Sequence, residues 1–234
     1  MNTVELLTNF NLTRQEASIY MTLLTEGDLN GYEVAKKTGI SRSNIYTSLA
    51  TLVDKGCAYI IEEAAVRYTP VPLKEFLNNE IRMLQNIKEV LISNQPHKRE
   101  DFEGYITIKG ENNILNKLRN MILEAKARVY ISVSGKILEY ILSDINDAVC
   151  RGLKMVIITN VMICLDGAII HHTDKDLQQI RIIADSTDVL TGDIHEGEYS
   201  TCLYSKKKNL IDLFKDSMRN EIILIEMMKG NKKE

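Results

Sequence analysis

Apolar residues recur at helical spacing in three consecutive segments near the start of the chain, 13–27, 31–39 and 41–56. In each segment the apolar side chains fall mainly on one face, and polar side chains occupy the other. Residues that favour helix ends mark the boundaries: Thr13 with Glu16 in capping-box spacing, Gly27, Gly39 and Gly56. The pattern predicts three short helices that pack against one another.

After these helices the pattern changes to short runs rich in Ile, Val and Tyr. Residues 57–70 are typical of two β-strands joined by a turn at 62–65 and closed by Pro70. Three helices followed by a hairpin is the element order of a winged helix-turn-helix, which places its recognition helix in the major groove of DNA. We therefore predict such a domain over residues 1–72, with the recognition helix beginning at Ser41.

The N-terminal end of this third helix is polar. A helix that enters the major groove needs small polar or basic side chains there, because these reach base edges and phosphates. The candidate DNA-binding residues are Ser41, Arg42, Ser43, Asn44, Tyr46 and Thr47, with Lys55 and Arg67 as phosphate contacts. The alternative is a winged helix that contacts only proteins, in which Ser41 is merely an N-cap and Tyr46 merely a core residue.

Residues 73–95 contain no Gly or Pro, and their apolar positions alternate in spacings of four and three, interrupted at Glu80. This spacing is typical of a coiled coil. The predicted dimerisation seam consists of Leu73, Leu77, Leu84, Ile87 and Leu91. The pattern in isolation fits an ordinary core helix equally well, but its place directly after the hairpin favours a dimer. A polar stretch at 96–104 is expected to be a linker.

Beyond the linker, strand and helix patterns alternate, which is typical of an α/β domain. Strands are expected at 105–109, 128–133, 153–159, 180–184, 189–194 and 200–205. Helices are expected at 112–125, 137–151 and from Asn209 to about Met228. The whole chain is therefore expected to be α/β, with a winged helix-turn-helix, a linking coiled-coil helix and an effector-sensing α/β domain over 105–234.

Composition agrees with two folded domains, since 44% of the 234 residues are hydrophobic and 26% are charged. Charge does not help the DNA hypothesis. The net charge is −3, and residues 1–72 hold six Lys and Arg against eight Asp and Glu. A basic balance is the usual footprint of a DNA-binding domain. The hypothesis therefore depends on element order and on the placement of individual side chains.

The four cysteines lie far apart and form no C-x-x-C pair, which argues against a disulfide framework and against a zinc knuckle. Cys202, in a predicted strand, is either a buried residue or an exposed thiol sensor. The N-terminus lacks a signal-peptide pattern, and no stretch approaches the ~20 apolar residues of a membrane span. We expect a cytoplasmic protein without a membrane partner.

The segment LTRQEASIYMTLLTEGDLNGYEVAKKTGISRSNIYTSLATLVDKG resembles the N-terminal domain of TrmB-like transcriptional regulators. The resemblance is clearest over residues 12–72. It implies a winged helix that binds operator DNA as a dimer, a helical dimerisation segment, and a C-terminal phospholipase-D-like domain that senses an effector.

Two features separate the chain from proteins that it resembles. Longer relatives add a further C-terminal sugar-binding domain, for which 234 residues leave no room, so we do not extend the resemblance to a sugar effector. A phospholipase-D site needs a His with a Lys two residues later. The four histidines are instead followed at that spacing by Arg99, Thr173, Asp174 and Gly197. We therefore expect no enzymatic activity; a phosphodiesterase or nuclease on the second domain is the alternative.

Acidic residues and histidines concentrate in two segments, 166–177 and 184–198. The candidate effector-binding residues there are Asp166, His171, His172, Asp185, Asp188 and His195, with Asp193 nearby. Imidazole and carboxylate groups can ligate a divalent ion, but no tight His spacing is present, so neither a metal nor a cofactor is expected. The alternative is that these are solvated loop residues between strands.

These patterns together favour a one-component regulator. The expected partners are double-stranded operator DNA, a second copy of the chain and a small-molecule effector. A protein-interaction winged helix remains the third alternative.

Overall fold

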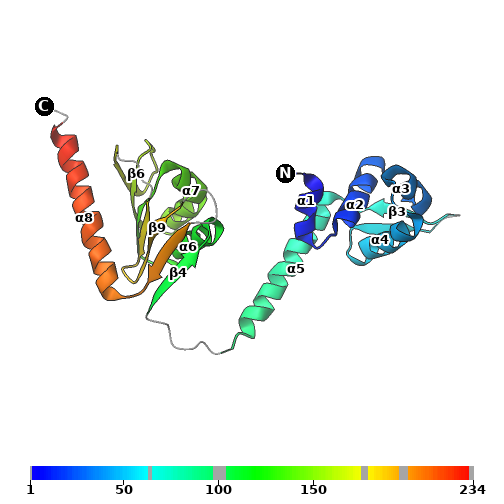
Figure 1. Ribbon diagram of the computed structural model, residues 1–234, viewed down its shortest axis with the longest axis horizontal. Helices are drawn as coiled ribbons and strands as arrows, with labels where there is room; N and C mark the ends of the chain where they lie inside the picture. Colours follow the sequence, from blue (N-terminus) through cyan, green and yellow to red (C-terminus); the bar gives the residue numbers. More distant parts are fainter. Residues whose placement is uncertain (1, 63–64, 97–103, 175–178, 195–199, 232–234) are drawn as a thin grey trace. The chain divides into compact units, whose positions relative to one another are not determined.

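The computed structural model describes residues 2–62, 65–96, 104–174, 179–194 and 200–231 (Figure 1). The chain divides into two compact units, residues 1–99 and 100–234, which are described separately. Across the described residues, none of the helices combines the length and apolarity needed to cross a bilayer.

The first unit consists of short helices and a small antiparallel sheet with strand order β1-β3-β2 (Figure 1). Its elements are α1 (Thr3–Leu7), η1 (Thr8–Phe10), α2 (Arg14–Glu26), β1 (Leu29–Asn30), α3 (Gly31–Thr38), α4 (Arg42–Asp54), β2 (Ala58–Ile61), β3 (Arg67–Pro70) and α5 (Leu73–Ser93). The three predicted helices and the hairpin are confirmed. Missing from the prediction are α1, η1 and β1. Strand β1 has only two residues and exists through its pairing of Leu29 with Tyr68, a partner that local pattern does not reveal.

A continuous apolar core joins these elements. The ring of Tyr20 from α2 packs edge-on against Phe76 from α5, with centroids 5.6 Å apart. The Tyr20 hydroxyl donates a hydrogen bond to the backbone carbonyl of Val71 at 2.7 Å. The first turn of α5 is therefore fixed to the winged-helix core, because burying this aromatic pair and its polar group stabilises one geometry.

The second unit is a seven-stranded mixed sheet with strand order β4-β10-β9-β8-β5-β6-β7. Its elements are β4 (Tyr105–Lys109), α6 (Glu111–Glu124), β5 (Arg128–Ser132), α7 (Gly135–Cys150), β6 (Lys154–Thr159), β7 (Ala168–His172), β8 (Gln179–Ala184), β9 (Asp188–Asp193), β10 (Thr201–Ser205) and α8 (Lys208–Asn231). Strands β5, β6 and β7 run parallel, and the remaining pairs are antiparallel.

Helices cover both faces of this sheet (Figure 1). Helices α6 and α7 bury one face, in a core that includes Leu118, Ile141 and Ile157. Helix α8 packs on the other face through Met218 and Ile225. Successive side chains along a strand point to opposite faces of the sheet. The pairing of the strands therefore shows which residues lie on the face that α8 covers.

Strand β7 is a departure from the sequence prediction, which expected no strand between 153–159 and 180–184. It forms the edge of the parallel part of the sheet and pairs only with β6, matching Ile158 to His171. Its sequence, AIIHH, lacks clear alternation, and Ile169 on its outer face is 48% exposed. An edge strand with two polar residues gives a weak signal because only one of its faces is well buried.

Candidate DNA-binding surface and effector site

Helix α4 presents a polar, solvent-exposed first turn. Its buried positions are Ile45, Ser48, Leu49 and Leu52, which fix the orientation of the helix on the core. All six predicted contact residues on this helix are exposed: Ser41, Arg42, Ser43, Asn44, Tyr46 and Thr47. Tyr46 is 52% exposed, so it is not the buried core residue of the alternative interpretation.

The N-terminus of α4 differs from those of the two helices before it. In α2 and α3 a complete capping box satisfies the first turn, with Thr13 and Glu16 in one and Asn30 and Glu33 in the other. Ser41, at the N-cap of α4, forms no such side-chain bond with any residue that the structure describes. The first turn of α4 thus lacks the cap that α2 and α3 have, and its residues 42–44 are exposed. An anion can accept hydrogen bonds from the backbone N–H groups of such a turn.

Charge is distributed unevenly along α4. Arg42 is its first residue, its first turn contains no acid, and its single acidic residue, Asp54, is its last. The positive end of the helix dipole thus coincides with a cationic side chain. The excess of acidic residues in 1–72 therefore does not lie at the start of α4.

Two contacts from α3 position the side chains of this surface. The guanidinium carbon of Arg42 lies 4.6 Å from the ring centroid of Tyr32. Gly31 accommodates the Tyr46 ring, since a Cβ atom at Gly31 would lie 2.5 Å from Cε1 of Tyr46. Tyr32 was not predicted from the sequence; the signal that could have identified it is an aromatic residue on the polar face of the first helix of a helix-turn-helix.

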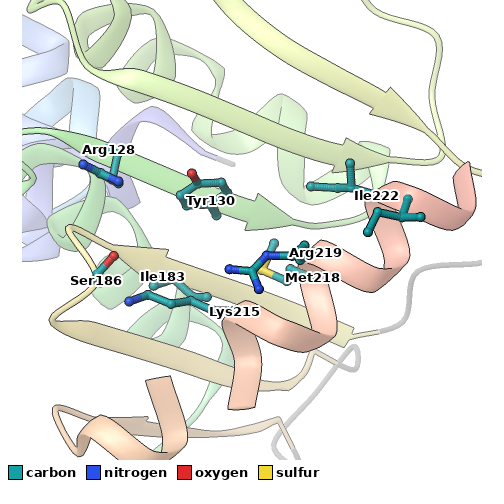
Figure 2. Close-up of a pocket in the computed structure, with 9 residues that line it drawn as sticks. Arg128, Tyr130, Ile183, Ser186, Lys215, Met218, Arg219 and Ile222 are labelled. Carbon is teal, nitrogen blue, oxygen red and sulfur yellow. The ribbon is translucent and has the colours of Figure 1, made fainter. Parts of the chain in front are cut away.

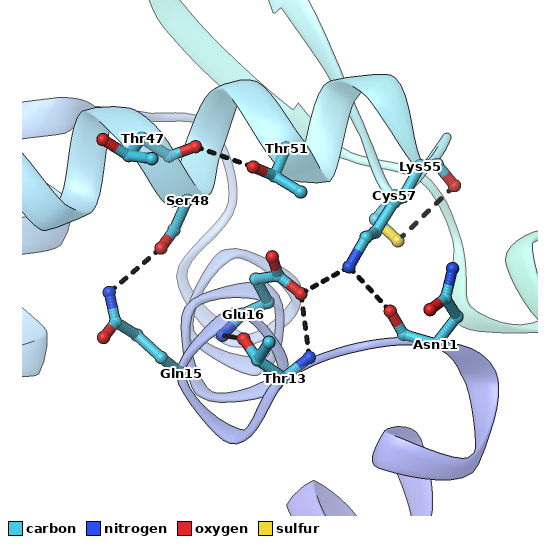
Figure 3. Close-up of polar contacts among 9 residues, drawn as sticks. All are labelled: Asn11, Thr13, Gln15, Glu16, Thr47, Ser48, Thr51, Lys55 and Cys57. Carbon is cyan, nitrogen blue, oxygen red and sulfur yellow. Dashed lines mark hydrogen bonds and ion pairs between the residues drawn. The ribbon is translucent and has the colours of Figure 1, made fainter.

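Lys55 does not belong to this surface (Figure 3). Its ammonium group donates to a carboxylate oxygen of Glu16 at 2.8 Å and to the backbone carbonyl of Asn11 at 2.7 Å. The Lys55 side chain is 24% exposed, and that of Glu16 is 8% exposed. This geometry does not support the predicted phosphate contact of Lys55, because the ammonium group already neutralises a buried carboxylate.

The same contacts set the charge state of Glu16. Burial opposes its ionisation, but hydrogen bonds from Lys55 and from the backbone N–H of Thr13, together with the Lys55 charge, outweigh burial. The pKa of Glu16 is lowered from its usual value as a result. Gln15 extends the contact between the helices by donating to the Ser48 hydroxyl at 3.0 Å (Figure 3).

Arg67 on strand β3 is likewise engaged within the domain. Its guanidinium group donates to the backbone carbonyl of Asp28 and lies 3.7 Å from a carboxylate oxygen of Glu33. These contacts tie the wing to the start of α3. The predicted phosphate contact of Arg67 is not supported by this geometry, because the guanidinium group is directed to its own domain.

Helix α5 combines two roles for its apolar residues. Leu73 and Leu77 pack against the winged-helix core. Farther along, the three remaining seam residues Leu84, Ile87 and Leu91 are 54%, 45% and 66% exposed. An ordinary core helix does not leave a regular apolar stripe in water. No other described residue of the first unit buries this part of α5.

The predicted effector residues do not form one site. Asp185 and Asp188 flank the turn between β8 and β9, whereas His171 and His172 end β7. The strand pairing aligns His171 with Arg181 across the sheet. Arg181 lies three residues before Ala184, the last residue of β8, so His171 is displaced by roughly 10 Å along the strands from the turn that holds Asp185. The two groups occupy opposite ends of the sheet.

Both carboxylates of the β8–β9 turn are committed to the fold. Asp185 accepts hydrogen bonds from the backbone N–H groups of Lys126, Ala127 and Arg128 at 2.7 to 2.9 Å. Burial raises its pKa, but these three bonds and the Arg128 charge outweigh burial and lower it. Asp188 accepts from the hydroxyls of Thr187 and Tyr204. These contacts fix a turn and do not support the predicted effector role of Asp185 and Asp188.

The histidine end of the sheet is also internally paired. His171 Nδ1 lies 2.9 Å from a carboxylate oxygen of Glu226 on α8, and His172 Nδ1 lies 3.8 Å from Asp174. Arg181 donates to Glu221 at 2.6 Å and to the Ser132 hydroxyl at 3.0 Å. The contacts with Glu226 and Glu221 anchor α8 to the sheet, and both histidines lie close to carboxylates of their own unit, so the geometry does not support the predicted effector role of these histidines.

The remaining candidates do not complete a site. Asp166 is exposed, and His195 lies outside the described residues. Among the residues that the structure describes, no three His, Cys, Asp or Glu side chains lie together as a metal ion would require. Cys202 is 2% exposed, and burial raises its pKa to about 11, which agrees with a buried strand residue and not with a thiol sensor.

A pocket of about 350 Å³ lies between the sheet and α8 (Figure 2). Its lining residues are Arg128, Tyr130, Ile183, Ser186, Lys215, Met218, Arg219, Ile222 and Ile223. None of them was predicted. The signal was present on α8, where Lys215, Met218, Arg219 and Ile222 recur at the spacing of one helix face. The residues from β5 and β8 could not be matched to them without the fold.

Comparison with known proteins identifies the family to which the chain belongs. The model described as sugar-specific transcriptional regulator TrmB matches residues 6–74, and the model described as the EBD N-terminal subdomain of transcriptional regulator TrmB matches residues 104–216. YrhO of Bacillus subtilis is 27% identical over 242 residues, which cover 99% of this chain and 88% of YrhO.

Two further similarities come from archaeal proteins. The sugar sensing transcriptional regulator TrmBL1 of Pyrococcus furiosus is 30% identical over 147 residues, covering 58% of this chain and 41% of TrmBL1. A solved structure of TrmBL2, an archaeal chromatin protein, is 22% identical, covers 94% of this chain and 96% of that chain, and has a TM-score of 0.47. Because two TrmB models account for both units, the chain belongs to the TrmB family of DNA-binding transcriptional regulators.

Proposed function

We propose that this chain is a dimeric, sequence-specific transcriptional regulator that reads operator DNA with α4. The observation that carries the proposal is the N-terminus of α4, which is exposed, polar and uncapped by any described side chain, beside two helices with complete capping boxes. A helix N-terminus without a cap lowers stability, because its first N–H groups lack a protein acceptor. A phosphate or base that accepts hydrogen bonds from these groups would compensate for the missing cap. Arg42, Ser43 and Asn44 supply base-edge or phosphate contacts.

Dimerisation is proposed through the exposed stripe of α5. Leu84, Ile87 and Leu91 are too regular and too exposed to serve the core of their own unit. Pairing two such helices buries the stripe, which is the main driving force for a coiled coil. Two-fold symmetry then sets two α4 helices on half-sites about one helical turn apart, ~34 Å. We assign 73–95 to dimerisation and 96–104 to a linker.

Effector control is assigned to the α/β unit, 105–234. A ligand shifts a regulator only if it favours one dimer geometry over another, because equal affinity for both states changes neither population. Helix α5 is the natural transmitter, since it connects the winged helix to the linker. The names of the family model and of TrmBL1 make a sugar one candidate effector. A regulator of this kind acts in the cytoplasm and is not an enzyme.

Selection of bound duplexes from a random library tests the DNA proposal, because the selection itself identifies the operator. We expect an enriched site with two-fold symmetry and half-sites about one turn apart, and an affinity that falls steeply with salt. Failure to enrich any sequence, with no salt-dependent affinity for duplex DNA, would instead favour a protein-interaction winged helix. Hydrolysis of a phosphodiester by the purified chain would favour the enzyme alternative.

A further inference from the structure

The pocket between the sheet and α8 has two chemically distinct ends. Figure 2 shows the nitrogen-bearing ends of Arg128, Lys215 and Arg219 on the side of Ser186, with Ile222 at the opposite end. We propose that this pocket binds a small organic anion with an apolar body. The proposal rests on the effector control proposed above and specifies the chemical class of the effector.

The cationic end is built from three separate elements. Arg128 begins β5, Ser186 lies in the β8–β9 turn, and Lys215 and Arg219 lie one turn apart on α8. Like charges brought together repel, and an anion bound among them would offset that repulsion. A carboxylate or phosphate matches guanidinium geometry and accepts several charge-assisted hydrogen bonds at once.

Acidic groups near the cluster leave this charge largely available. Arg219 contacts Asp216 at 3.2 Å, but both side chains are 68% exposed, and exposed pairs of this kind are weak. Lys215 lies 3.9 Å from Asp212, at the limit of an ion pair. Asp185 partly offsets the charge of Arg128, so Lys215 and Arg219 supply most of the positive charge that is free to act on a ligand.

The rest of the pocket is apolar. Tyr130 and Ile183 form the floor from the sheet, and Met218 and Ile222 form the wall from α8. Ile183 in the floor and Met218 in the wall are each 1% exposed, so both surfaces continue into the packed interior. A neutral sugar needs many hydroxyl and amide partners, and the only neutral polar side-chain groups among the described lining residues are the hydroxyls of Tyr130 and Ser186. The lining therefore favours an amphipathic acid over a sugar.

The turn that carries Ser186 is strained in a way consistent with a ligand contact. Asp185 and Ser186 adopt φ values of 49° and 63°, the left-handed region that favours glycine. Asp185 stabilises the turn through its backbone bonds, but the Ser186 side chain has no such task among the described residues and lines the pocket. Strain of this kind is retained most often at binding sites.

Calorimetric titration of the full chain with octanoate tests the proposal. Octan-1-ol, inorganic phosphate and glucose serve as comparisons, since they lack the charge, the apolar body and both, respectively. We expect octanoate to bind at least roughly tenfold more tightly than each of them, because a charge-assisted contact and apolar burial each contribute about 1.4 kcal/mol or more. Equal binding of octan-1-ol, or preferential binding of glucose, would overturn the proposal.

Variants locate the binding to this pocket. Arg219→Gln and, separately, Lys215→Gln are expected to weaken octanoate binding by about fivefold or more. Lys208→Gln removes one charge from the same helix outside the pocket and is the matched control, expected to leave binding unchanged. Unchanged affinity in both pocket variants would contradict the assignment. Operator affinity is measured separately, so loss of DNA binding and loss of anion binding remain distinguishable failures.

Discussion

The guanidinium group of Arg42 stacks over the ring of Tyr32, with 4.6 Å between the guanidinium carbon and the ring centroid. Tyr32 is 52% exposed and belongs to α3, whereas Arg42 opens α4. The contact therefore crosses the turn of the helix-turn-helix and limits the directions in which Arg42 can point.

Removal of the Tyr32 ring tests this positioning role. Tyr32→Ala is expected to weaken operator binding by roughly two- to fivefold, because an exposed cation–π contact is worth about 0.5 to 1 kcal/mol. Tyr32→Phe keeps the ring and is expected to retain most of the affinity, as measured by fluorescence anisotropy. A loss of equal size in both variants would mean that the Tyr32 hydroxyl, and not its ring, matters.

Substitution of Gly31 is expected to weaken operator binding, because Gly31 leaves room for the ring of Tyr46. Gly31→Ala places a Cβ atom 2.5 Å from Cε1 of Tyr46, so the ring must move. The ring is half-exposed and can rotate away, so stability should change by less than about 1 kcal/mol while operator affinity falls.

A double-mutant cycle separates this effect from a general one. If Gly31 acts through Tyr46, the losses in Gly31→Ala and Tyr46→Ala are not additive, and the double variant binds about as well as Tyr46→Ala alone. Additive losses in operator binding would indicate two independent roles.

The stripe on α5 predicts a charge-sensitive dimer. Ile87→Asp buries a carboxylate in the proposed seam, so the dimer dissociation constant should rise by roughly a hundredfold or more. Sedimentation equilibrium measures it. Asn86→Asp adds the same charge to the adjacent position, off the stripe, and should leave the dimer intact. A dimer that tolerates both changes equally would place the interface elsewhere.

Glu16 predicts a pH dependence for the first unit. Its pKa in the folded protein lies below the ordinary value of 4.5, so its contribution to stability is present above that value and is lost as pH falls through the folded pKa. Glu16→Gln should lower the free energy of unfolding at pH 7 by roughly 1 to 3 kcal/mol, because Lys55 loses its charged acceptor. The variant should also lose part of the acid-side slope. Urea unfolding at several pH values between 3 and 7 measures both; an unchanged slope would contradict the assignment.

Local signals predicted the helices of the first unit well. The pair Thr13 and Glu16 forms the capping box that its spacing indicated, and Gly39 adopts φ 73° at the end of α3. These features depend on residues within one turn of one another, so the sequence contains them directly.

Contacts between distant residues could not be predicted in this way. The ion pair of Lys55 was not foreseen because its partner, Glu16, lies 39 residues away in the sequence. Strand β7 depends on pairing with β6 and not on its own pattern. The pocket brings Arg128 beside Lys215, and only the sheet order places those segments together.

The central claim is that α4 reads DNA from its N-terminal end, and Arg42→Ala tests it most directly. Binding to the selected operator should be measured against salt concentration for this variant and for Lys208→Ala, a charge removed from the other unit. For Arg42→Ala we predict a loss of about 1 to 3 kcal/mol in the free energy of operator binding, or a slope of log affinity against log salt concentration that is smaller by about one. For Lys208→Ala we predict no change in either quantity. Operator affinity and salt slope that are unchanged in Arg42→Ala would contradict the claim.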